Sequence, residues 1–229
     1  MNHDSLNSLR SKKISETFRK RKIDNFKKWR EEMKRTGRTP RYLSFIRSKD
    51  LAEYIGVVLG DGNISSFPRT ERLIIVGNLN NAGFIRQYSL LTEKIFGKIP
   101  TATKISGSNA IRISIYQKFI SKRLNIPSGD RAKYIFKIPA WILGNKNYIV
   151  SLLKGLFEAE GSLSIHKKTC TYNFQFKNSN QSLLKTVADS LIYLGFHPEI
   201  RTNCTRLRRK KEVESFKYLI KFREYRSSI

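Results

Sequence analysis

The sequence predicts an α+β protein made of two similar αββαββα half-domains that follow a basic N-terminal extension. Three observations support this prediction. They are an internal repeat with a period of about 100 residues, two short glycine-containing helices that each end in an acid, and strands in which apolar and polar residues alternate. A chain of 229 residues is long enough for one substantial domain or for two small ones that share an interface.

Residues 1–50 are predicted to form the extension, and its segment Ser15–Arg35 is predicted to be helical. Four apolar residues of this segment fall near helical spacing among many basic residues: Phe18, Phe26, Trp29 and Met33. A Thr-Gly-Arg-Thr-Pro run then ends the helix. Two interpretations stay open, a solvated extension and a basic arm that lies along phosphates.

Residues 51–124 are predicted to form the first half-domain and residues 147–229 the second, with a linker at 125–146 that contains Pro and Gly. The first half is expected to contain, in order, a helix at Leu51–Gly60, a strand at Arg72–Val76, a helix at Asn81–Phe96, strands at Thr101–Ser106 and Ala110–Tyr116, and a helix at Gln117–Leu124. The second half is expected to repeat this order, with a helix at Tyr148–Ala159, a strand at Tyr172–Lys177, a helix at Gln181–Leu194, strands at Glu199–Thr202 and Thr205–Lys210, and a helix at Lys211–Arg223.

The chain has 45 Lys and Arg residues against 18 Asp and Glu residues, which gives a formal charge of +27 spread along its whole length. Such a surface favours a long polyanion, so nucleic acid is the leading partner. No apolar stretch has the length of a membrane helix and no secretory signal is recognisable, so we expect no membrane partner. We expect a cytoplasmic, nucleoid-associated protein, or an organellar one if its host element is organellar.

Cysteine and histidine do not suggest a metal centre. Cys170 and Cys204 are too few for a disulfide framework, and neither has the spacing of a zinc-ligand pair. With His3, His166 and His197 as its three histidines, the sequence argues against a histidine–metal nuclease site.

The first helix of each half has small residues four positions apart on one face. These are Gly56 and Gly60 in the first half, and Gly155 and Ala159 in the second. Glycine in a helix interior costs about 0.5–1 kcal/mol relative to alanine, so two in one short helix need a reason. We interpret these residues as the interface of two helices that cross with their backbones nearly touching.

An acid stands at the C-terminal end of each of these helices, Asp61 in the first half and Glu160 in the second. The negative end of the helix dipole disfavours an acid by about 0.3–1 kcal/mol, and crossing helices would bring the two acids together. Such a cluster is stable when it is protonated or bound to cations. Oxygen ligands favour Mg²⁺ over zinc, with Mn²⁺ as a substitute. Two acids with metal ions beside a phosphodiester describe metal-assisted hydrolysis.

At these residues the chain resembles a LAGLIDADG homing endonuclease of the single-chain, two-motif type. The second motif, LKGLFEAEG, matches the nine-residue name with conservative changes except for Lys154 in an Ala place. The first motif is looser, with Gly60 in an Ala place, but it keeps the acid Asp61. The resemblance covers roughly residues 51–223.

This resemblance implies two αββαββα halves related by a pseudo-twofold axis, with the motif helices at the interface and two antiparallel sheets that form a concave saddle on duplex DNA. It implies that Asp61 and Glu160 bind Mg²⁺ together with nearby backbone carbonyls, here assigned to Gly60 and Ala159, and that each acid serves the cut on one strand. A monomer that cleaves both strands of a long target and leaves short 3′ overhangs is expected, as in intron homing.

Many members of this family also place a Lys or Gln just before the second helix of each half, where it polarises the water network. In the second half Lys177 stands one position off and precedes Asn178, whereas the first half has Asn78 and no Lys, so Lys104 is a candidate replacement. We assign catalytic contributions to Lys177, Asn78 and Asn178. If no other basic residue fills the role in the first half, the two half-sites differ in rate.

Strand alternation predicts an outward face of polar side chains suited to reading base edges. Asn173 and Gln175, for example, point away from Phe174 and Phe176. The candidate DNA contacts are Arg69, Arg72, Lys104, Arg112, Ser114, Tyr116, Lys168, Asn173, Gln175, Lys177, Arg201, Arg206, Arg208 and Lys210.

Two other functions stay open at this point. Some members of the family bind their intron's RNA as maturases, so host intron RNA is a second candidate partner. A non-cleaving DNA-binding regulator could use the same scaffold. Retention of both acids favours the endonuclease, because binding alone gives no reason to keep an acidic pair facing phosphates.

Overall fold

The computed structural model describes residues 13, 16–17, 20, 27–37, 42–131 and 134–225. The chain divides into two compact units, Met1–Leu43 and Ser44–Ile229. The division falls after Leu43 rather than after residue 50, because Phe45 belongs to the core of the second unit. Its ring lies 5.0 Å from that of Phe96, edge to face, and the Arg123 guanidinium stacks on it at 3.8 Å.

The first unit contains α2, Lys27–Arg35. No residue of α2 is buried, and Trp29 is 59% exposed. The predicted helix at Ser15–Arg35 is therefore confirmed in its C-terminal part. Much of its N-terminal part, including Phe18 and Phe26, lies outside the described residues.

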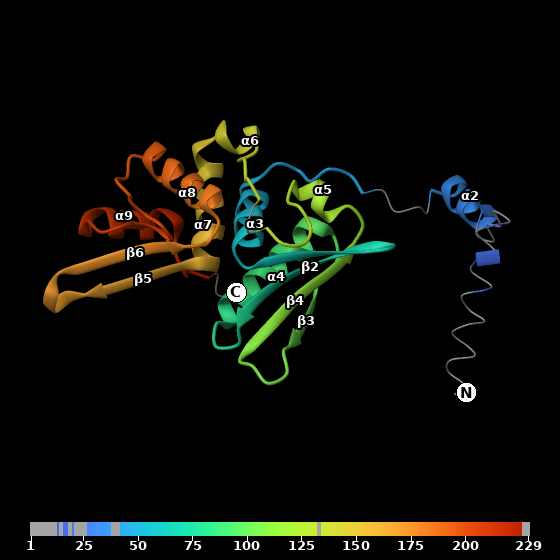
Figure 1. The fold of residues 1–229 in the computed structure, drawn as a ribbon, viewed down its shortest axis with the longest axis horizontal. Helices are drawn as coiled ribbons and strands as arrows, with labels where there is room; N and C mark the ends of the chain where they lie inside the picture. Colours follow the sequence, from blue (N-terminus) through green and yellow to red (C-terminus); the bar gives the residue numbers. More distant parts are fainter. Residues whose placement is uncertain are drawn as a thin grey trace. The chain divides into compact units, whose positions relative to one another are not determined.

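The second unit contains both halves in the predicted αββαββα order (Figure 1). The first half comprises α3 (Lys49–Gly60), β1 (Gly62–Phe67), β2 (Thr70–Asn78), α4 (Ala82–Phe96), β3 (Thr101–Lys104), β4 (Ala110–Gln117) and α5 (Ile120–Leu124). The second half comprises α7 (Lys146–Glu160), β5 (Gly161–His166), the 3₁₀ turn η1 (Lys167–Thr169), β6 (Thr171–Lys177), α8 (Gln181–Tyr193), β7 (Glu199–Arg201), β8 (Cys204–Leu207) and α9 (Lys210–Ile220). The segment between them holds the short helix α6, Ala140–Leu143.

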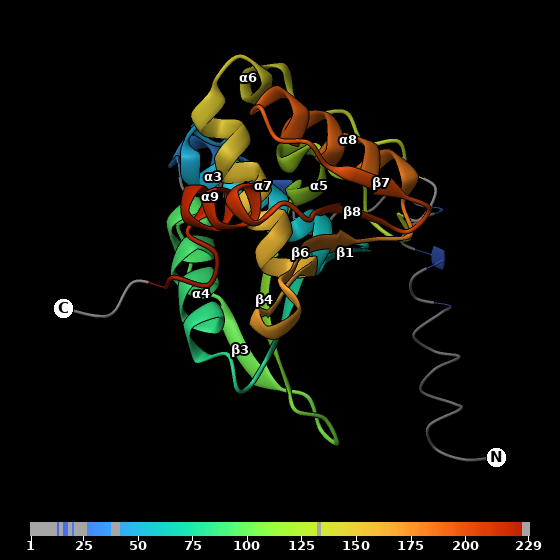
Figure 2. The same ribbon diagram turned by 90° about the vertical axis from the view of Figure 1, so that its left-hand side faces the viewer.

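Each half builds one four-stranded antiparallel sheet with the same topology. The strand orders are β1-β2-β4-β3 and β5-β6-β8-β7. The helices α3, α4 and α5 pack on one face of the first sheet, and α7, α8 and α9 on one face of the second. Figure 2 shows the β3–β4 hairpin of the first half extending beyond the helices. In the described residues, no helix is long and apolar enough to cross a membrane.

Two strands, β1 and β5, have no counterpart among the strands located from the sequence. They follow directly on α3 and α7 and pair with β2 and β6, with Gly62 opposite Ile75 and Gly161 opposite Phe176. Their sequences, GNISSF and GSLSIH, are poor in β-branched and aromatic residues. They are strands because the tight turn after each helix directs the chain back along the sheet, which is a tertiary effect.

The last predicted strand, Thr205–Lys210, is shorter in the structure. The strand β8 ends at Leu207, and Lys210 is the first residue of α9. The run Leu207–Arg209 therefore turns the corner from strand to helix instead of continuing the alternation. Arg208 and Lys210 therefore lie outside the strand in which the sequence placed them.

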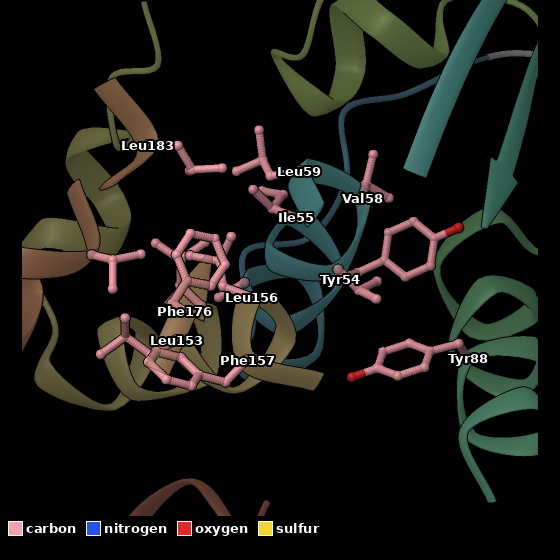
Figure 3. Close-up of a cluster of buried hydrophobic side chains, with 14 of the residues drawn as sticks. Tyr54, Ile55, Val58, Leu59, Tyr88, Leu153, Leu156, Phe157, Phe176 and Leu183 are labelled. Atoms are coloured by element: carbon pink, nitrogen blue, oxygen red, sulfur yellow. The ribbon is translucent and has the colours of Figure 1, made fainter. Parts of the chain in front are cut away.

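The helices α3 and α7, which we call the motif helices, cross with their backbones in contact, as the small residues predicted. A Cβ on Gly56 would lie 2.3 Å from the Leu152 carbonyl oxygen, and one on Gly155 would lie 2.0 Å from the Glu53 carbonyl oxygen. No side chain fits at either position. Figure 3 shows the core on both sides of this crossing, with Tyr54 on one side and Phe157 on the other.

The unusual Lys154 of the second motif has a partner across this interface. Its Nζ lies 3.2 Å from Glu53 Oε1, and both side chains are largely buried, at 19% and 11% exposure. The same carboxylate oxygen accepts hydrogen bonds from Gln87 Nε2 and Tyr88 Oη. The polar pair is therefore satisfied, and it joins the two halves at a distance from the acids.

We predict that Gly155→Ala destabilises the protein by about 3 kcal/mol, because the added methyl group would have to displace main-chain atoms of α3. The melting temperature should fall by roughly 6–12 °C. The matched control is Gly144→Ala, since a Cβ there would meet nothing closer than 3.6 Å. Equal melting temperatures for Gly155→Ala and the control would contradict the close crossing of the motif helices.

Candidate active site and nucleic-acid face

The two acids lie together at the ends of the motif helices. Asp61 caps α3, and Glu160 is the last residue of α7. Gly60 lies against the other helix, since a Cβ there would be 2.5 Å from Ala159 Cβ and 3.2 Å from Glu160 Cγ. The predicted interface residues Gly60 and Ala159 therefore bring the helix ends and their acids to one place.

Both carboxyl groups are shifted toward the neutral form in the metal-free protein. Burial, together with the charge of the nearby Glu160, raises the pKa of Asp61 to about 7. Burial also raises the pKa of Glu160 above its usual range. Two carboxylates and two carbonyl-rich helix ends share this region, so a cation would relieve both the desolvation and the repulsion.

The donor set fits a hard divalent cation. Asp61 and Glu160 offer carboxylate oxygens, and Gly60 and Ala159 lie immediately before them with main-chain carbonyls at the helix ends. In the described part of the chain, no group of three or more His, Cys, Asp and Glu residues is placed to hold a metal ion. A site of one or two carboxylates suits Mg²⁺ or Mn²⁺, which keep waters and take phosphate oxygens from a substrate, and does not suit zinc.

Asn78 and Asn178, which the sequence proposed as catalytic, build equivalent turns before α4 and α8. The side-chain oxygen of Asn78 accepts a hydrogen bond from the Asn80 amide at 2.8 Å, and that of Asn178 accepts one from the Asn180 amide at 2.8 Å. Their acceptor oxygens therefore have a structural use. Lys177, at the end of β6, is exposed and has the free side chain that Asn178 lacks.

The outward face of the first sheet carries four of the predicted contacts, Arg72, Arg112, Ser114 and Tyr116. Cross-strand pairing places Arg72 opposite Tyr116, and Ser114 opposite Ile74. The Arg72 guanidinium lies over the Tyr116 ring at 6.0 Å, and the Nε of Arg72 is a buried donor without a partner in the protein. Arg112 shares this face, two residues from Ser114 along β4.

The outward face of the second sheet has an acid among its bases. Gln175 pairs with Arg206, and Arg206 pairs with Glu199. The Nε of Arg206 donates to Glu199 at 2.9 Å, and Arg201 also donates to Glu199. These two hydrogen bonds lower the pKa of Glu199 to about 2. The two arginines predicted to contact DNA are therefore bound within the protein, and Glu199 places a negative charge on the face.

On the same sheet Asn173 differs from these arginines, because one of its polar atoms has no hydrogen-bond partner. It lies on β6, with its neighbours Phe174 and Phe176 pointing into the core. Its Oδ1 is buried and has no hydrogen-bond partner in the protein. A buried acceptor of this kind is costly unless a ligand donates to it.

The other predicted contacts lie at the edges of the sheets. Arg69 is in the β1–β2 turn, Lys168 is in η1, and Arg208 follows β8. Lys104 pairs with Ile111, so it shares the helix-covered face and not the face of Arg112. That register follows from the alternation in β4, and it does not favour Lys104 as the residue that would polarise the water network in the first half.

Two residues of the site and of the outward faces were missed from the sequence. Arg131, in the predicted linker, donates to main-chain oxygens on both sides of Asp61. Glu199 organises two arginines of the outward face. An acid in a strand otherwise bearing basic residues could have indicated Glu199, but nothing in the linker sequence indicates Arg131.

Part of the chain matches a known family of protein domains. Residues 147–226 match the family model described as a LAGLIDADG-like domain. A comparison with curated proteins gives no match. The chain therefore carries a LAGLIDADG-like domain in its second half, as the motif predicted.

Solved structures extend the likeness over both halves. The homing endonuclease I-DmoI in complex with DNA and Mn aligns with a TM-score of 0.54 at 16% identity, over 75% of this chain and 96% of that one. Mesophilic variants of I-DmoI align with a TM-score of 0.53 at 17% identity, over 75% and 94%. The N-terminal LAGLIDADG domain of DUF199/WhiA aligns with a TM-score of 0.51 at 15% identity, over 80% and 85%. The chain has the LAGLIDADG fold, and the resemblance predicted from the two motifs is confirmed.

We predict that Asp61→Asn stabilises the metal-free protein at pH 8. The folded pKa of about 7 lies above the usual value of 3.8 for an aspartate, so folding favours the neutral carboxyl. That stability is complete below pH 3.8 and is lost as the pH rises to 7. At pH 8 in EDTA the variant should be more stable by roughly 1–3 kcal/mol, discounted for partial exposure, and the difference should vanish near pH 4.

Urea unfolding at both pH values measures this difference. Asp189→Asn is the control, because Asp189 is exposed on α8 and should give no such pH dependence. A variant that is no more stable than the natural protein at pH 8 would contradict the burial of the Asp61 charge.

Proposed function

We propose that this protein is a site-specific DNA endonuclease that acts as a monomer and hydrolyses a phosphodiester on each strand of a long duplex target. The observation that supports this most directly is the meeting of Asp61 and Glu160 at the ends of two crossed helices, with their carboxyl pKa values raised. The fold is shared with a homing endonuclease solved in complex with DNA and Mn. In this proposal each acid serves one strand.

The residues of the chain have separate tasks in this reaction. Asp61 and Glu160, with the carbonyls of Gly60 and Ala159, would hold Mg²⁺ or Mn²⁺. When bound, the cation supplies Lewis-acid stabilisation of the phosphate and lowers the pKa of a water. The crossing of the helices fixes the separation of the two acids, and hence of the two reacting phosphates. Lys177, at the end of β6, places a positive charge beside the Glu160 end of the site.

The two sheets would bind the duplex through their outward faces. These faces carry Arg, Asn, Gln and Ser side chains in register, which are groups that hydrogen-bond to base edges in the major groove. Asn173 Oδ1 and Arg72 Nε are buried without protein partners. A base amino group for Asn173 and an acceptor for Arg72 would satisfy both, which supports binding of a ligand at this face.

Two alternatives use the same surface. The fold occurs in I-DmoI and in DUF199/WhiA, so the fold alone does not choose between a nuclease and a non-cleaving DNA-binding regulator. An RNA-binding maturase would use the same basic charge. The paired acids favour the nuclease, because a binding protein gains nothing from two desolvated carboxyl groups facing phosphates.

We predict that Asp61→Asn and Glu160→Gln each abolish one of the two strand cuts, and that the double variant cuts neither. A pooled duplex library treated with the protein and Mg²⁺ identifies the target and the ends produced. Each single variant should reduce its own cut by at least about 100-fold, because a carboxylate that binds metal cannot be replaced by an amide. Binding of the target in Ca²⁺ should stay within about threefold.

The double variant and a Ca²⁺ reaction are the controls in this assay. A double variant that cuts at the natural rate would refute the assignment of the acids. If a library that holds the native site is bound but not cut, the regulator is supported. If intron RNA is bound and the duplex is not, the maturase is supported.

We predict that Glu199→Gln increases affinity for duplex DNA by roughly three- to tenfold. The change removes a negative charge from the outward face and releases Arg201 and Arg206 for phosphates or base edges. The gain should shrink as salt is raised. Fluorescence anisotropy against a labelled duplex at several salt concentrations measures it, with Glu214→Gln, an exposed change on α9, as the charge-matched control. Equal effects of the two changes would contradict this role of Glu199.

A further inference from the structure

Each half of the second unit is followed by a segment that contacts both halves. The segment after α5 contains Arg131, and the segment after α9 contains Tyr225. Each of these side chains reaches the motif helix of its own half, and each segment also meets the residue that begins the second helix of the other half. We call these two segments the crossed clasps.

The first clasp holds the turn that contains Asp61. The Nη1 of Arg131 donates to the Val58 carbonyl oxygen at 2.9 Å, and its Nη2 donates to the Gly62 carbonyl oxygen. These carbonyls stand before and after Asp61. The Arg131 carbonyl in turn accepts a hydrogen bond from Asn180 Nδ2 at 2.9 Å.

Asn180 belongs to the other half and is itself fixed. It is the N-cap of α8, it is 9% exposed, and its Oδ1 accepts from the Leu183 amide at 3.0 Å. A cavity of about 280 Å³ lies beside this contact, lined by Gly60, Arg131 and Asn180 among others. The first clasp thus joins the Asp61 turn to a rigid point in the second half.

The second clasp also links the motif helix of its own half to a helix N-cap of the other half, but through a tyrosine hydroxyl instead of a guanidinium. The hydroxyl of Tyr225 donates to Glu158 Oε2 at 2.7 Å, and it accepts from Asn81 Nδ2 at 3.2 Å. Asn81 is the N-cap of α4 in the first half. The Tyr225 ring lies on Gly83, where a Cβ would be 2.2 Å from ring carbon Cδ2. Glu158 stands two residues before Glu160 on α7.

The two clasps are equivalent by position. Asn81 and Asn180 cap corresponding helices, and Arg131 and Tyr225 lie in the segments that follow corresponding halves. They differ in what they hold, because Arg131 reaches the main chain on both sides of its acid, whereas Tyr225 reaches a side chain in the last turn before its acid. In the described residues, no side chain donates to the carbonyls at the end of α7 as Arg131 does at the end of α3.

We propose that Arg131 and Tyr225 are positioning residues, each of which sets the acid of its own half relative to the other half of the protein. Two desolvated acids at helix ends repel each other and their own helix carbonyls, so the last turn of each motif helix would open without an anchor. Arg131 provides two charge-assisted hydrogen bonds at one turn. Tyr225 provides a hydrogen-bonded bridge at the other. The effect of these residues on strand cutting rests on the proposed function. Their effect on the order of the helix ends does not.

The structural consequence can be measured without metal or DNA. Hydrogen–deuterium exchange should rise at least tenfold in residues 57–66 in Arg131→Met and stay within twofold in residues 157–166. Tyr225→Phe should show the reverse. Arg131→Lys keeps the charge and can donate to one carbonyl, so its exchange in residues 57–66 should lie between those of the natural protein and Arg131→Met. It replaces Arg131→Met in the experiment if that variant does not fold.

Two exposed changes serve as controls for the exchange experiment. Lys122→Met on α5 and Tyr218→Phe on α9 remove the same kinds of group where the side chain is exposed, and exchange in both segments should stay unchanged. Equal exchange increases in both segments for either clasp variant would indicate general destabilisation and would overturn the proposal, as would no change in either.

The catalytic consequence is a strand-selective loss. The cuts are first assigned with Asp61→Asn and Glu160→Gln on a target labelled on each strand. Arg131→Met should then slow the Asp61-dependent cut at least tenfold and the other at most twofold, and Tyr225→Phe should do the opposite. Equal slowing of both strands would overturn the proposal. If the natural protein cuts neither strand, the proposed function fails, and the exchange result still decides whether the clasps hold the acids.

Discussion

The close crossing of the two motif helices is the constraint on which the rest of the structure depends. At Gly56 and Gly155 the backbone of one helix occupies the space that a side chain of the other would need. The crossing point therefore cannot slide, and the helix ends beyond it are set at a fixed separation. Gly60 against Ala159 continues the contact to the last turn, so packing that involves no charge brings the two helix ends to one place.

This packing has an electrostatic cost, and the structure offsets it differently at the two ends of the interface. At one end, Lys154 and Glu53 form a largely buried pair whose carboxylate has further hydrogen-bond donors. At the other end, burial raises the pKa values of both Asp61 and Glu160. Carboxyl groups whose charged forms are destabilised in this way suit an end that receives a divalent cation from solution.

Most of this fold could be predicted because most of it depends on local pattern. Helix periodicity, the alternation of Phe174 and Phe176 with polar neighbours, and the spaced glycines are properties of short segments. The strands β1 and β5 were not located, because segments such as GNISSF become strands only when a turn places them beside β2 and β6. Lys210 was assigned to a strand because the alternation continues past the true strand end. Arg131 could not be assigned at all, since its partners lie about 70 residues earlier and no local pattern links them.

The two halves are alike in backbone and unlike in how positive charge reaches the acids. In the second half Lys177 ends β6, directly after Phe176, which pairs with Gly161, the residue that follows Glu160. In the first half the corresponding strand ends in Asn78, whose side chain is used in a turn. There Arg131, from the segment after the half, donates to main-chain oxygens before and after the acid instead of standing free. A duplicated backbone does not require duplicated chemistry, because the pseudo-twofold axis fixes where a charge is needed and leaves open which element provides it.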